Sequence, residues 1–354
     1  MLDINKQQLN SKTKNKGGVY MLKVMECFGG IGACSKGLEN LGIEHELVEY
    51  IELDKHAVKS FNAIHNTSFL PQDITTWDKD LEVDLIMSGS PCQSFSIVGK
   101  QEGGDEGSGT KSSLLYETIR IITKLRPKYV IWENVKNVLG QKHKHNFDNY
   151  LKEMVKLGYS NFYQVMNAKD YGLPHNRDRV FTVSVRDYYE FIVDNIDDFG
   201  YIESHHEPVQ YEFTFPSKEE LITRFKDIVE LDKKWEVPRH IIKSFATKTG
   251  DFSRRFTTRG LDDIATCVTT KPNWAVITNN YFTEHFEKRS IQEIYNNNIP
   301  LYTISPRCAW RLMGFSDEDF DKASVDSSPG QLYKQAGNSI AVPVIQKILA
   351  ELLT

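Results

Sequence analysis

Short apolar runs alternate with amphipathic stretches from residue 21 to residue 187, and this rhythm restricts the possible folds more than any other feature. Strands that alternate with helices of about 10 residues are typical of an α/β fold with a doubly wound, mostly parallel sheet. Strands are predicted at residues 21–28, 46–52, 83–87, 129–132, 161–168 and 179–185. Helices are predicted at residues 33–41, 56–65, 114–125 and 146–157.

The rhythm stops after about residue 187, and residues 190–300 mix short polar, aromatic and charged pieces. An apolar helix predicted at residues 342–353 could pack back on the sheet. We therefore expect one domain built from residues 1–188 and 329–354. A second, smaller and irregular domain would span residues 189–328.

The composition limits the kinds of binding partner and the cellular compartment that the sequence indicates. The net charge of −5 means that any polyanion must bind where basic groups are concentrated locally. No apolar run approaches the roughly 18 residues that span a bilayer, and the polar first twenty residues do not resemble a signal peptide. The five cysteines lack paired spacing, which argues against a zinc site or a disulfide framework. We expect a cytoplasmic protein without a metal.

A glycine-rich turn follows the first predicted strand in "ECFGGIGACSKG". Gly29, Gly30 and Gly32 would let a ligand approach the backbone closely, and Glu52 ends the second strand in a place suited to ribose hydroxyls. Asp73, expected after a further strand, could contact an adenine amino group. Because Ser35 replaces the last glycine of the dinucleotide pattern, a nucleoside without a diphosphate fits better. A structural tight turn and a dehydrogenase both remain open at this point.

A thiol and a carboxyl stand at the ends of two predicted strands. Cys92 follows Pro91 after residues 83–87, and Glu133 follows residues 129–132. If these strands are neighbours, both groups project into the crevice at the carboxyl end of the sheet. A nucleophile with a proton donor beside it would result. Residues 96–113 contain five glycines and are predicted to form a moving lid.

Six blocks of the sequence together resemble the DNA cytosine-5 methyltransferases. In chain order they read "ECFGGIG", "SPCQSFS", "WENV", "YGLPHNRDRVF", "RLMGF" and "QAGNSIAVPV". The resemblance implies a Rossmann-like methyltransferase fold, and the region without blocks, roughly residues 190–300, corresponds to that family's target-recognition domain. It also implies methyl transfer from S-adenosyl-L-methionine to C5 of a cytosine flipped out of duplex DNA.

The resemblance implies four catalytic residues. The Cys92 thiolate would add to C6 of the cytosine, which makes C5 nucleophilic. Glu133 would donate a proton to N3, which requires a pKa raised by burial. Arg179, with Arg177 nearby, would hold the O2 side of the base.

The implied cofactor site is larger and comes from several loops. Its residues are Phe28, Gly29, Gly30, Ile31, Gly32, Glu52, Leu53, Asp73, Ile74, Pro91, Leu114 and Asn338.

DNA contacts are expected from the lid and from a basic stretch of the recognition region. The candidates are Ser94, Ser96, Arg239, Lys248, Arg254, Arg255, Arg259, Thr269, Thr270 and Lys271. His175 stands where the family pattern usually has Gln, and its role stays open. Residues 311–315, "RLMGF", are interpreted as a structural brace. We expect a monomer that acts on double-stranded DNA, in a restriction-modification system or alone.

Three alternatives remain. A transfer-RNA cytosine methyltransferase on the same scaffold would differ after its catalytic cysteine and lack the long recognition insert. A nicotinamide-dependent oxidoreductase would share the first loop and Glu52 but give no reason for Cys92, Glu133 or the arginines. A non-catalytic DNA-binding protein would have no need to retain these reactive groups.

Overall fold

The structure is a computed structural model of the 354-residue chain. It describes residues 21–91, 114–196, 202–209, 211–246, 257–260, 264–265, 267–270, 274–277 and 291–354.

A six-stranded sheet with strand order β2-β1-β3-β4-β6-β5 forms the centre of the molecule. The neighbouring pairs of β2, β1, β3 and β4 are parallel, whereas β6 runs antiparallel to both β4 and β5. The strands are β1 (Leu22–Cys27), β2 (His45–Ile51), β3 (Leu85–Ser88), β4 (Tyr129–Val135), β5 (Tyr159–Asn167) and β6 (Asp178–Arg186). The prediction of a mostly parallel α/β sheet is confirmed.

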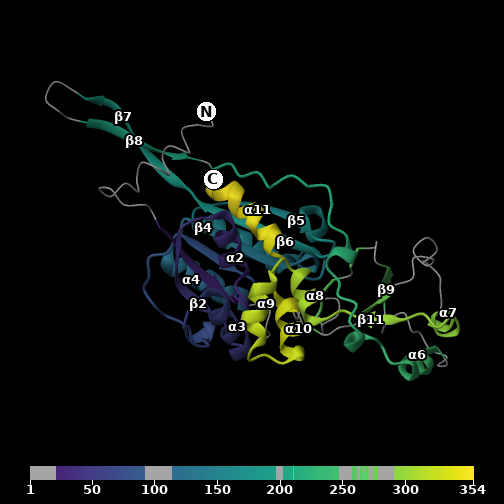
Figure 1. Cartoon of the computed structure of the whole chain (residues 1–354). Helices are drawn as coiled ribbons and strands as arrows, with labels where there is room; N and C mark the ends of the chain where they lie inside the picture. The colour runs from purple at the N-terminus through teal and green to yellow at the C-terminus, as the bar shows by residue number, and fades with distance from the viewer. Residues whose placement is uncertain are drawn as a thin grey trace.

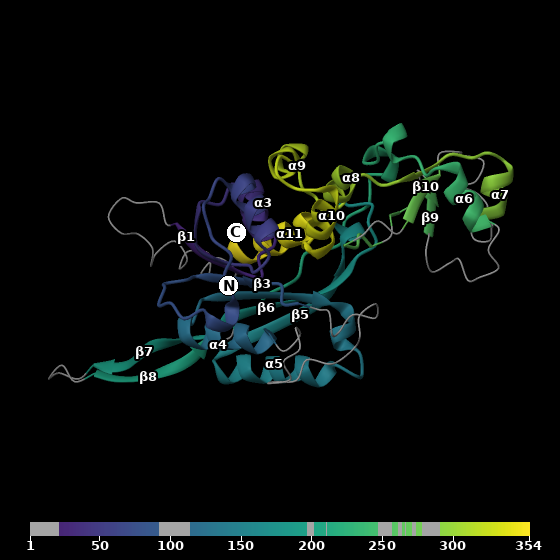
Figure 2. The same cartoon turned by 90° about the horizontal axis from the view of Figure 1, so that it is seen from below.

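Helices cover both faces of this sheet (Figure 2), because its strands are apolar on both sides. The helices α4 (Leu115–Leu125) and α5 (Lys144–Lys156) lie on one face, and α2 (Ala33–Leu41) and α11 (Val342–Leu353) pack together on the other. The helix α3 (Lys55–His65) contacts α9 (Asp317–Ser324). All five helices predicted from periodicity are present, and two of them have the predicted bounds.

One expected strand is absent. Asp73 was predicted to follow a strand, but residues 66–72 form none. Asp73 instead begins a short 3-10 turn, where its side chain accepts a hydrogen bond from the backbone N–H of Thr75. In this segment, the ring of Phe69 packs against Tyr50 and Phe61. The prediction was wrong because this segment is held by side chains rather than by a ladder.

The recognition region forms two separate parts (Figure 1). The hairpin of β7 (Tyr188–Ile196) and β8 (Ile202–Val209) projects from one end of the molecule. At the other end lie α6 (Arg239–Ala246), α7 (Ile291–Asn296) and a three-stranded sheet of β9 (Thr257–Gly260), β10 (Trp274–Ile277) and β11 (Leu301–Thr303). A small apolar core that includes Val237, Ile242 and Leu301 belongs to this second part.

The chain rejoins the large core before residue 329. Ile304, Trp310 and Phe320 belong to the apolar core that contains the sheet and α11. They lie on or beside α8 (Pro306–Arg311) and α9, which precede α10 (Pro329–Asn338). The division of the chain at residues 188 and 329 stays a prediction, but the contacts of α8 and α9 are with the large core.

None of the helices in the described parts of the chain is both long enough and apolar enough to cross a membrane. The same residues contain no group of three or more His, Cys, Asp or Glu side chains that could hold a metal ion.

We predict that Ile348→Ala lowers the free energy of unfolding by about 2–5 kcal/mol, the range for removing a fully buried aliphatic side chain. Ile348 is 0% exposed on α11, at the centre of the packing on α2. Urea unfolding measures the change, and Glu351→Ala on the exposed side of the same helix should change it by about 0.5 kcal/mol or less. Equal effects of the two substitutions would contradict this packing.

Candidate active site

The ends of β3 and β4 lie side by side, as the candidate site requires. The two strands pair in parallel, with Ser88 opposite Trp132. Beyond β3, Ser90 accepts hydrogen bonds from Trp132 Nε1 (2.9 Å) and Asn134 Nδ2 (3.1 Å). These bonds fix the backbone immediately before Pro91. Cys92 itself lies outside the described residues, but the chain that leads into it is held at the end of β4.

Glu133 is a buried carboxyl at this sheet edge. Its side chain is 8% exposed, and Oε1 lies 3.0 Å from Nε of Arg179. Arg179 reaches it from β6, which pairs antiparallel with β4. The second oxygen faces the end of β3, because a methyl group built on Gly89 would lie 3.8 Å from Oε2. The acid therefore points toward the backbone three residues before Cys92.

Burial raises the pKa of Glu133 above its ordinary value, although the charges of Arg179 and Arg177 lower it. Desolvation disfavours a buried carboxylate, and the two guanidiniums offset only part of that cost. A raised pKa favours the protonated acid, which can donate a hydrogen bond. This is the state that a proton donor to a bound ring nitrogen needs.

Arg177 is positioned differently from Arg179. It is 4% exposed, and its guanidinium donates to the carbonyls of Val268 (3.2 Å), Gly337 (3.1 Å) and Ser339 (2.7 Å). These partners come from the recognition region and from the end of α10. Arg177 therefore ties three parts of the chain together beside Glu133, while Arg179 holds the acid directly.

The glycine-rich turn after β1 has the shape expected of a ligand cradle. Phe28 adopts a left-handed backbone with φ 55°, a conformation that costs a non-glycine residue energy and is often found at functional sites. Gly30 has φ 57°, and a side chain built there would project into open space. The turn is held by Tyr50, whose hydroxyl donates to the Gly30 carbonyl (2.6 Å), and by Glu52, which accepts from Gly30 N (3.2 Å).

A cavity joins this turn to Glu133. It is lined by Glu26, Cys27, Phe28, Gly29, Gly30, Ala33, Cys34, Met87, Gly89, Glu133, Asn338, Ser339 and Ile340. Of the predicted cofactor residues, Phe28, Gly29, Gly30 and Asn338 thus line one cavity together with Glu133. The open backbone at Gly30 would let a ligand approach closely beside this buried acid.

Glu52 lies behind this cradle and is held by the following loop. Its carboxylate accepts from Asp54 N (2.8 Å), and its carbonyl accepts from Gln72 N (2.9 Å). Burial raises the pKa of Glu52, an effect that the hydrogen bonds from Asp54 and Gly30 reduce. The residue is therefore placed at the end of β2 beside the turn, as the sequence predicts.

The segment that carries Asp73 and Ile74 is held by Glu49, which sequence reasoning missed. Its carboxylate accepts from Gln72 Nε2 (2.7 Å) and Trp77 Nε1 (3.0 Å) and pairs with Lys79 (2.6 Å). No spacing rule connects a residue of β2 to a loop more than twenty positions later. The Glu49 side chain therefore holds residues 72–79 in place through these three contacts.

The other predicted cofactor residues lie in varied surroundings. Ile31 is buried in the core, and a side chain on Gly32 would collide with Phe61 and His65, so both serve packing. Leu53 is 67% exposed, and Leu114 packs against the core beneath α4 and α5.

Sequence reasoning also missed Glu26 and Cys267. Glu26 is buried at the end of β1 and accepts from the backbone and hydroxyl of Ser35 in the first turn of α2. Cys267 lies 3.5 Å from Nη1 of Arg177. Burial raises the pKa of the Cys267 thiol, but the charges of Arg177 and Arg179 outweigh this effect and lower that pKa overall. Only the fold brings this second thiol to the arginines.

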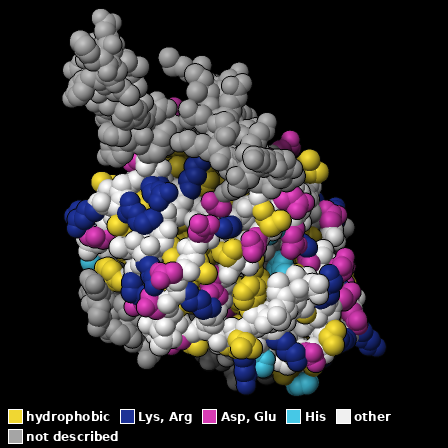
Figure 3. Space-filling model, turned by 90° about the vertical axis from the view of Figure 1, so that its left-hand side faces the viewer, with side chains coloured by type: hydrophobic (Ala, Val, Ile, Leu, Met, Phe, Trp, Pro, Cys, Tyr) yellow, Lys and Arg dark blue, Asp and Glu magenta, His cyan; other side chains and the backbone are white. Residues whose placement is uncertain are grey.

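The predicted DNA contacts are placed only in part. Arg239 on α6 packs over the ring of Tyr295 on α7, with its guanidinium carbon 4.7 Å from the ring centroid. Thr269 and Thr270 lie against α10, and Arg259 is part of β9. Ser94, Ser96, Lys248, Arg254, Arg255 and Lys271 lie outside the described residues. On the face turned away from β9 and α6, acidic and basic side chains are interspersed (Figure 3), so the described part of this face offers no extended basic surface.

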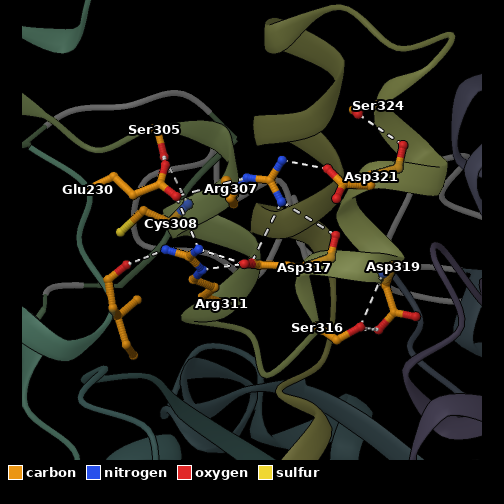
Figure 4. Close-up of polar contacts among 11 residues, drawn as sticks. Glu230, Ser305, Arg307, Cys308, Arg311, Ser316, Asp317, Asp319, Asp321 and Ser324 are labelled. Carbon is orange, nitrogen blue, oxygen red and sulfur yellow. Dashed lines mark hydrogen bonds and ion pairs between the residues drawn. The ribbon is translucent and has the colours of Figure 1, made fainter. Parts of the chain in front are cut away.

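Residues 311–315 act as a brace, in agreement with their interpretation from sequence (Figure 4). Arg311 forms two hydrogen bonds with the carboxylate of Asp317, each 2.7 Å long, and pairs with Glu230 at 3.0 Å. Its third nitrogen donates to the carbonyl of Ile228 (3.0 Å). These contacts thus join residues 228–230 of the recognition region to α8 and α9.

The buried acid generates a prediction about stability and pH. Because the pKa of Glu133 is raised above 4.5 in the folded protein, the folded state keeps a proton that the unfolded chain has lost. Stability therefore falls as pH rises from about 4.5 to the folded pKa, by about 1.4 kcal/mol for each pH unit between the two. Glu133→Gln should remove this loss, so the variant gains stability relative to the wild-type protein as pH rises.

Urea unfolding at a series of pH values measures the difference. Glu351→Gln removes an exposed carboxyl from α11 and controls for the change in net charge. A difference between Glu133→Gln and the wild-type protein that stays constant with pH would show that the pKa of Glu133 is not raised in the folded protein.

Comparison with known proteins identifies the family. A family model described as C-5 cytosine-specific DNA methylase matches residues 22–354. The Type II methyltransferase M2.ScrFI of Lactococcus lactis subsp. cremoris is 29% identical, with 94% of this chain and 99% of the relative covered. The Type II methyltransferase M.HhaI of Haemophilus parahaemolyticus is 30% identical, with 92% and 93% covered.

A solved structure supports the fold. The Entamoeba histolytica methyltransferase EhMeth superposes with a TM-score of 0.69 at 17% identity, covering 95% of this chain and 100% of that one. With the match over nearly the whole chain, and with a buried acid, an arginine partner and a glycine cradle meeting at one sheet edge, the chain belongs to the C-5 cytosine-specific DNA methylase family.

Proposed function

We propose that this DNA methyltransferase methylates C5 of a flipped-out cytosine through a covalent adduct between Cys92 Sγ and C6, with S-adenosyl-L-methionine as methyl donor. The observation that carries the proposal is the buried, arginine-held carboxyl of Glu133, which faces the end of the neighbouring strand that leads into Cys92. A thiol and a protonated acid on opposite edges of one pyrimidine ring supply the two groups that addition across C5–C6 needs.

In this proposal, Cys92, Glu133 and Arg179 act on different atoms of the base. The Cys92 thiolate forms a bond to C6, and the electron pair of the C5–C6 bond becomes available at C5. Glu133 donates its proton toward N3, where negative charge would otherwise accumulate. Arg179 keeps Glu133 oriented and presents a positive charge to the O2 side of the ring. C5 then takes the methyl group as the bond between that methyl and the donor sulfur breaks. A base, which we propose is water, removes the C5 proton, so that the C5–C6 double bond re-forms and the bond from Cys92 Sγ to C6 breaks.

We propose an indirect, electrostatic role for Arg177. Its guanidinium is already engaged by three backbone carbonyls, so its contribution to the base comes through its charge beside Glu133 and Arg179. A direct contact of Arg177 with the base stays a prediction.

We place the cofactor at the glycine turn that lines the cavity beside Glu133. When bound, S-adenosyl-L-methionine supplies an electrophilic methyl group. We propose that Gly30 and Phe28 give its nucleoside room to approach the backbone, that Glu52 accepts from the ribose, and that Asn338 closes the far side. Asp73 and Ile74, on the segment ordered by Glu49, would receive the adenine. Pro91, Leu53 and Leu114 stay predictions for the methyl end and the rim.

The partner proposed is double-stranded DNA, held by the recognition region and by the loop after Cys92. The brace through Arg311 supports this arrangement, because it fixes residues 228–230 of the recognition region onto α8 and α9. Both bacterial relatives reported above are named type II methyltransferases, which favours a role in restriction-modification. A cytoplasmic location, a monomeric state and independence from metal stay predictions.

The three alternative functions would each require a different site or substrate. The activity of an oxidoreductase does not require a buried acid that faces the end of β3. A non-catalytic DNA-binding protein does not require the pKa of that acid, Glu133, to be raised. A transfer-RNA methyltransferase shares the chemistry but not the substrate. Incubation with tritiated S-adenosyl-L-methionine and either plasmid DNA or transfer RNA separates these cases, and we expect label in DNA alone.

Cys92→Ser should abolish methyl transfer and leave DNA binding within about threefold of wild type, because the hydroxyl is a far weaker nucleophile than a thiolate. DNA with 5-fluorocytosine at the target should trap the wild-type protein covalently in the presence of cofactor, since the fluorine cannot leave as a proton. Denaturing gels detect the trapped complex, and Cys92→Ser should form none. A trapped complex with the serine variant would remove Cys92 from its role.

Replacing Arg254 and Arg255 together with Gln should weaken DNA binding and reduce the slope of log affinity against log salt by about 2, as expected when two phosphate contacts are lost. Fluorescence anisotropy at several salt concentrations measures this slope. The matched control replaces Lys152 and Lys156 of α5 with Gln and should leave it unchanged. An unaltered slope in the arginine variant would place both residues outside the interface.

A further inference from the structure

One short piece of the recognition region lies inside the catalytic domain. We call residues 265 and 267–270 the return segment. Its Ala265 pairs with the chain that leads into β6: Ala265 N donates to the Pro174 carbonyl (2.8 Å), and Asn176 N donates to the Ala265 carbonyl (2.8 Å). The return segment therefore begins as one more extended chain beside the residues that precede Arg177.

His175 holds the return segment through its ring. The side chain is 0% exposed; Val268 N lies 2.8 Å from Nε2, and Nδ1 lies 3.0 Å from the Leu312 carbonyl. A backbone amide can only donate, so Nε2 accepts and the proton must be on Nδ1, which donates to Leu312. The neutral ring thus uses both nitrogens and links the return segment to the end of α8.

The same two bonds determine what faces the arginines. With Val268 fixed by His175, its carbonyl accepts from Arg177, and Sγ of Cys267 lies 3.5 Å from Nη1 of Arg177. The charge of Arg179, which holds Glu133, also lowers the pKa of the Cys267 thiol. A series of neighbouring groups therefore leads from the ring of His175 to Glu133.

The return segment is closed in from its other side by α10. A methyl group on Gly337 would lie 2.5 Å from the backbone carbon of Thr269 and 2.5 Å from the nitrogen of Thr270. Contacts this short require one of the two chains to move. The segment therefore has a single position, between His175 and Gly337, in which Cys267 meets the arginine pair.

We propose that His175 is a positioning residue: its neutral ring clamps the return segment so that Cys267 and Val268 set the orientation of Arg177 and Arg179, and through them of Glu133. The recognition region is coupled to the catalytic acid by this clamp. The inference deepens the proposed function and rests on it. It assigns to His175 an effect on the rate of methyl transfer rather than on cofactor binding.

Four substitutions test the clamp in the full-length protein. His175→Leu removes both hydrogen bonds, whereas His175→Gln keeps an acceptor and a donor at a similar separation. Gly337→Ala displaces the return segment from the opposite side without touching His175. His145→Leu, at an exposed position on α5, is the matched control.

The main measurement is the single-turnover rate at which tritium is transferred from labelled S-adenosyl-L-methionine to plasmid DNA. The dissociation constant for that cofactor is measured separately for each variant. Because small displacements of catalytic groups can cost up to about 100-fold in rate, we expect His175→Leu and Gly337→Ala to be slower by about 10- to 100-fold. His175→Gln should remain within about threefold of wild type, and all variants should bind the cofactor within about twofold. Hydrogen exchange should show lost protection at Val268 in His175→Leu but not in His175→Gln or His145→Leu.

Each outcome decides the proposal. Wild-type rates in His175→Leu and Gly337→Ala would overturn it, as would a His175→Gln variant as slow as His175→Leu. Parallel loss of cofactor affinity would reduce His175 to a general structural role. If His175→Leu does not fold, the rates of His175→Gln and Gly337→Ala carry the test. A wild-type protein that labels no DNA would refute the proposed function, while protection at Val268 would still report on the clamp.

Discussion

The contact between the Glu133 carboxyl and the Arg179 guanidinium is the interaction on which the rest of the site depends. It is placed by the sheet: β4 supplies the acid, β6 runs antiparallel beside it and supplies the arginine, and β3 on the other side supplies the chain to Cys92. Burial makes the acid costly to ionise, and the arginine keeps it oriented without removing that cost. A different strand order would separate these three groups.

The same edge of the sheet collects the other parts of the molecule. The glycine turn after β1 opens on the cavity that contains Glu133, and α10 closes that cavity with Asn338. Arg177 then links α10 to the recognition region through backbone carbonyls. The glycine turn, Glu133 and the recognition region are therefore joined by a small number of buried polar contacts, which transmit position because few alternatives exist in a packed interior.

The bounds of a helix could be predicted from the sequence where residues with strong conformational preferences stand at its ends. The helix Ala33–Leu41 lies between Gly32 and Gly42, both in the left-handed conformation, and the helix Val342–Leu353 has a proline in its first turn, so both were predicted with the observed bounds. The shared crevice expected for Cys92 and Glu133 was conditional on neighbouring strands, and the parallel pairing of β3 with β4 meets that condition. The role of Cys92 stays a prediction, because its position lies outside the described residues.

Contacts between distant segments could not be predicted in this way. A strand was expected before Asp73, but the ring of Phe69 in that segment packs on Tyr50 while Glu49 holds the following residues. Cys267 had no local feature that pointed to the arginines, and His175 differed from the family pattern without indicating its partners. Their roles depend on the tertiary fold, which places Val268 and Leu312 on opposite sides of one imidazole ring.

A crystal structure of the protein bound covalently to DNA with 5-fluorocytosine at the target would test the central claim most directly. Our account predicts a single pyrimidine ring with Cys92 Sγ bonded to C6 and the Glu133 carboxyl within hydrogen-bond distance of N3, still held by Arg179. A base bound in a pocket that the Glu133 carboxyl does not reach, or an adduct to another residue, would contradict it.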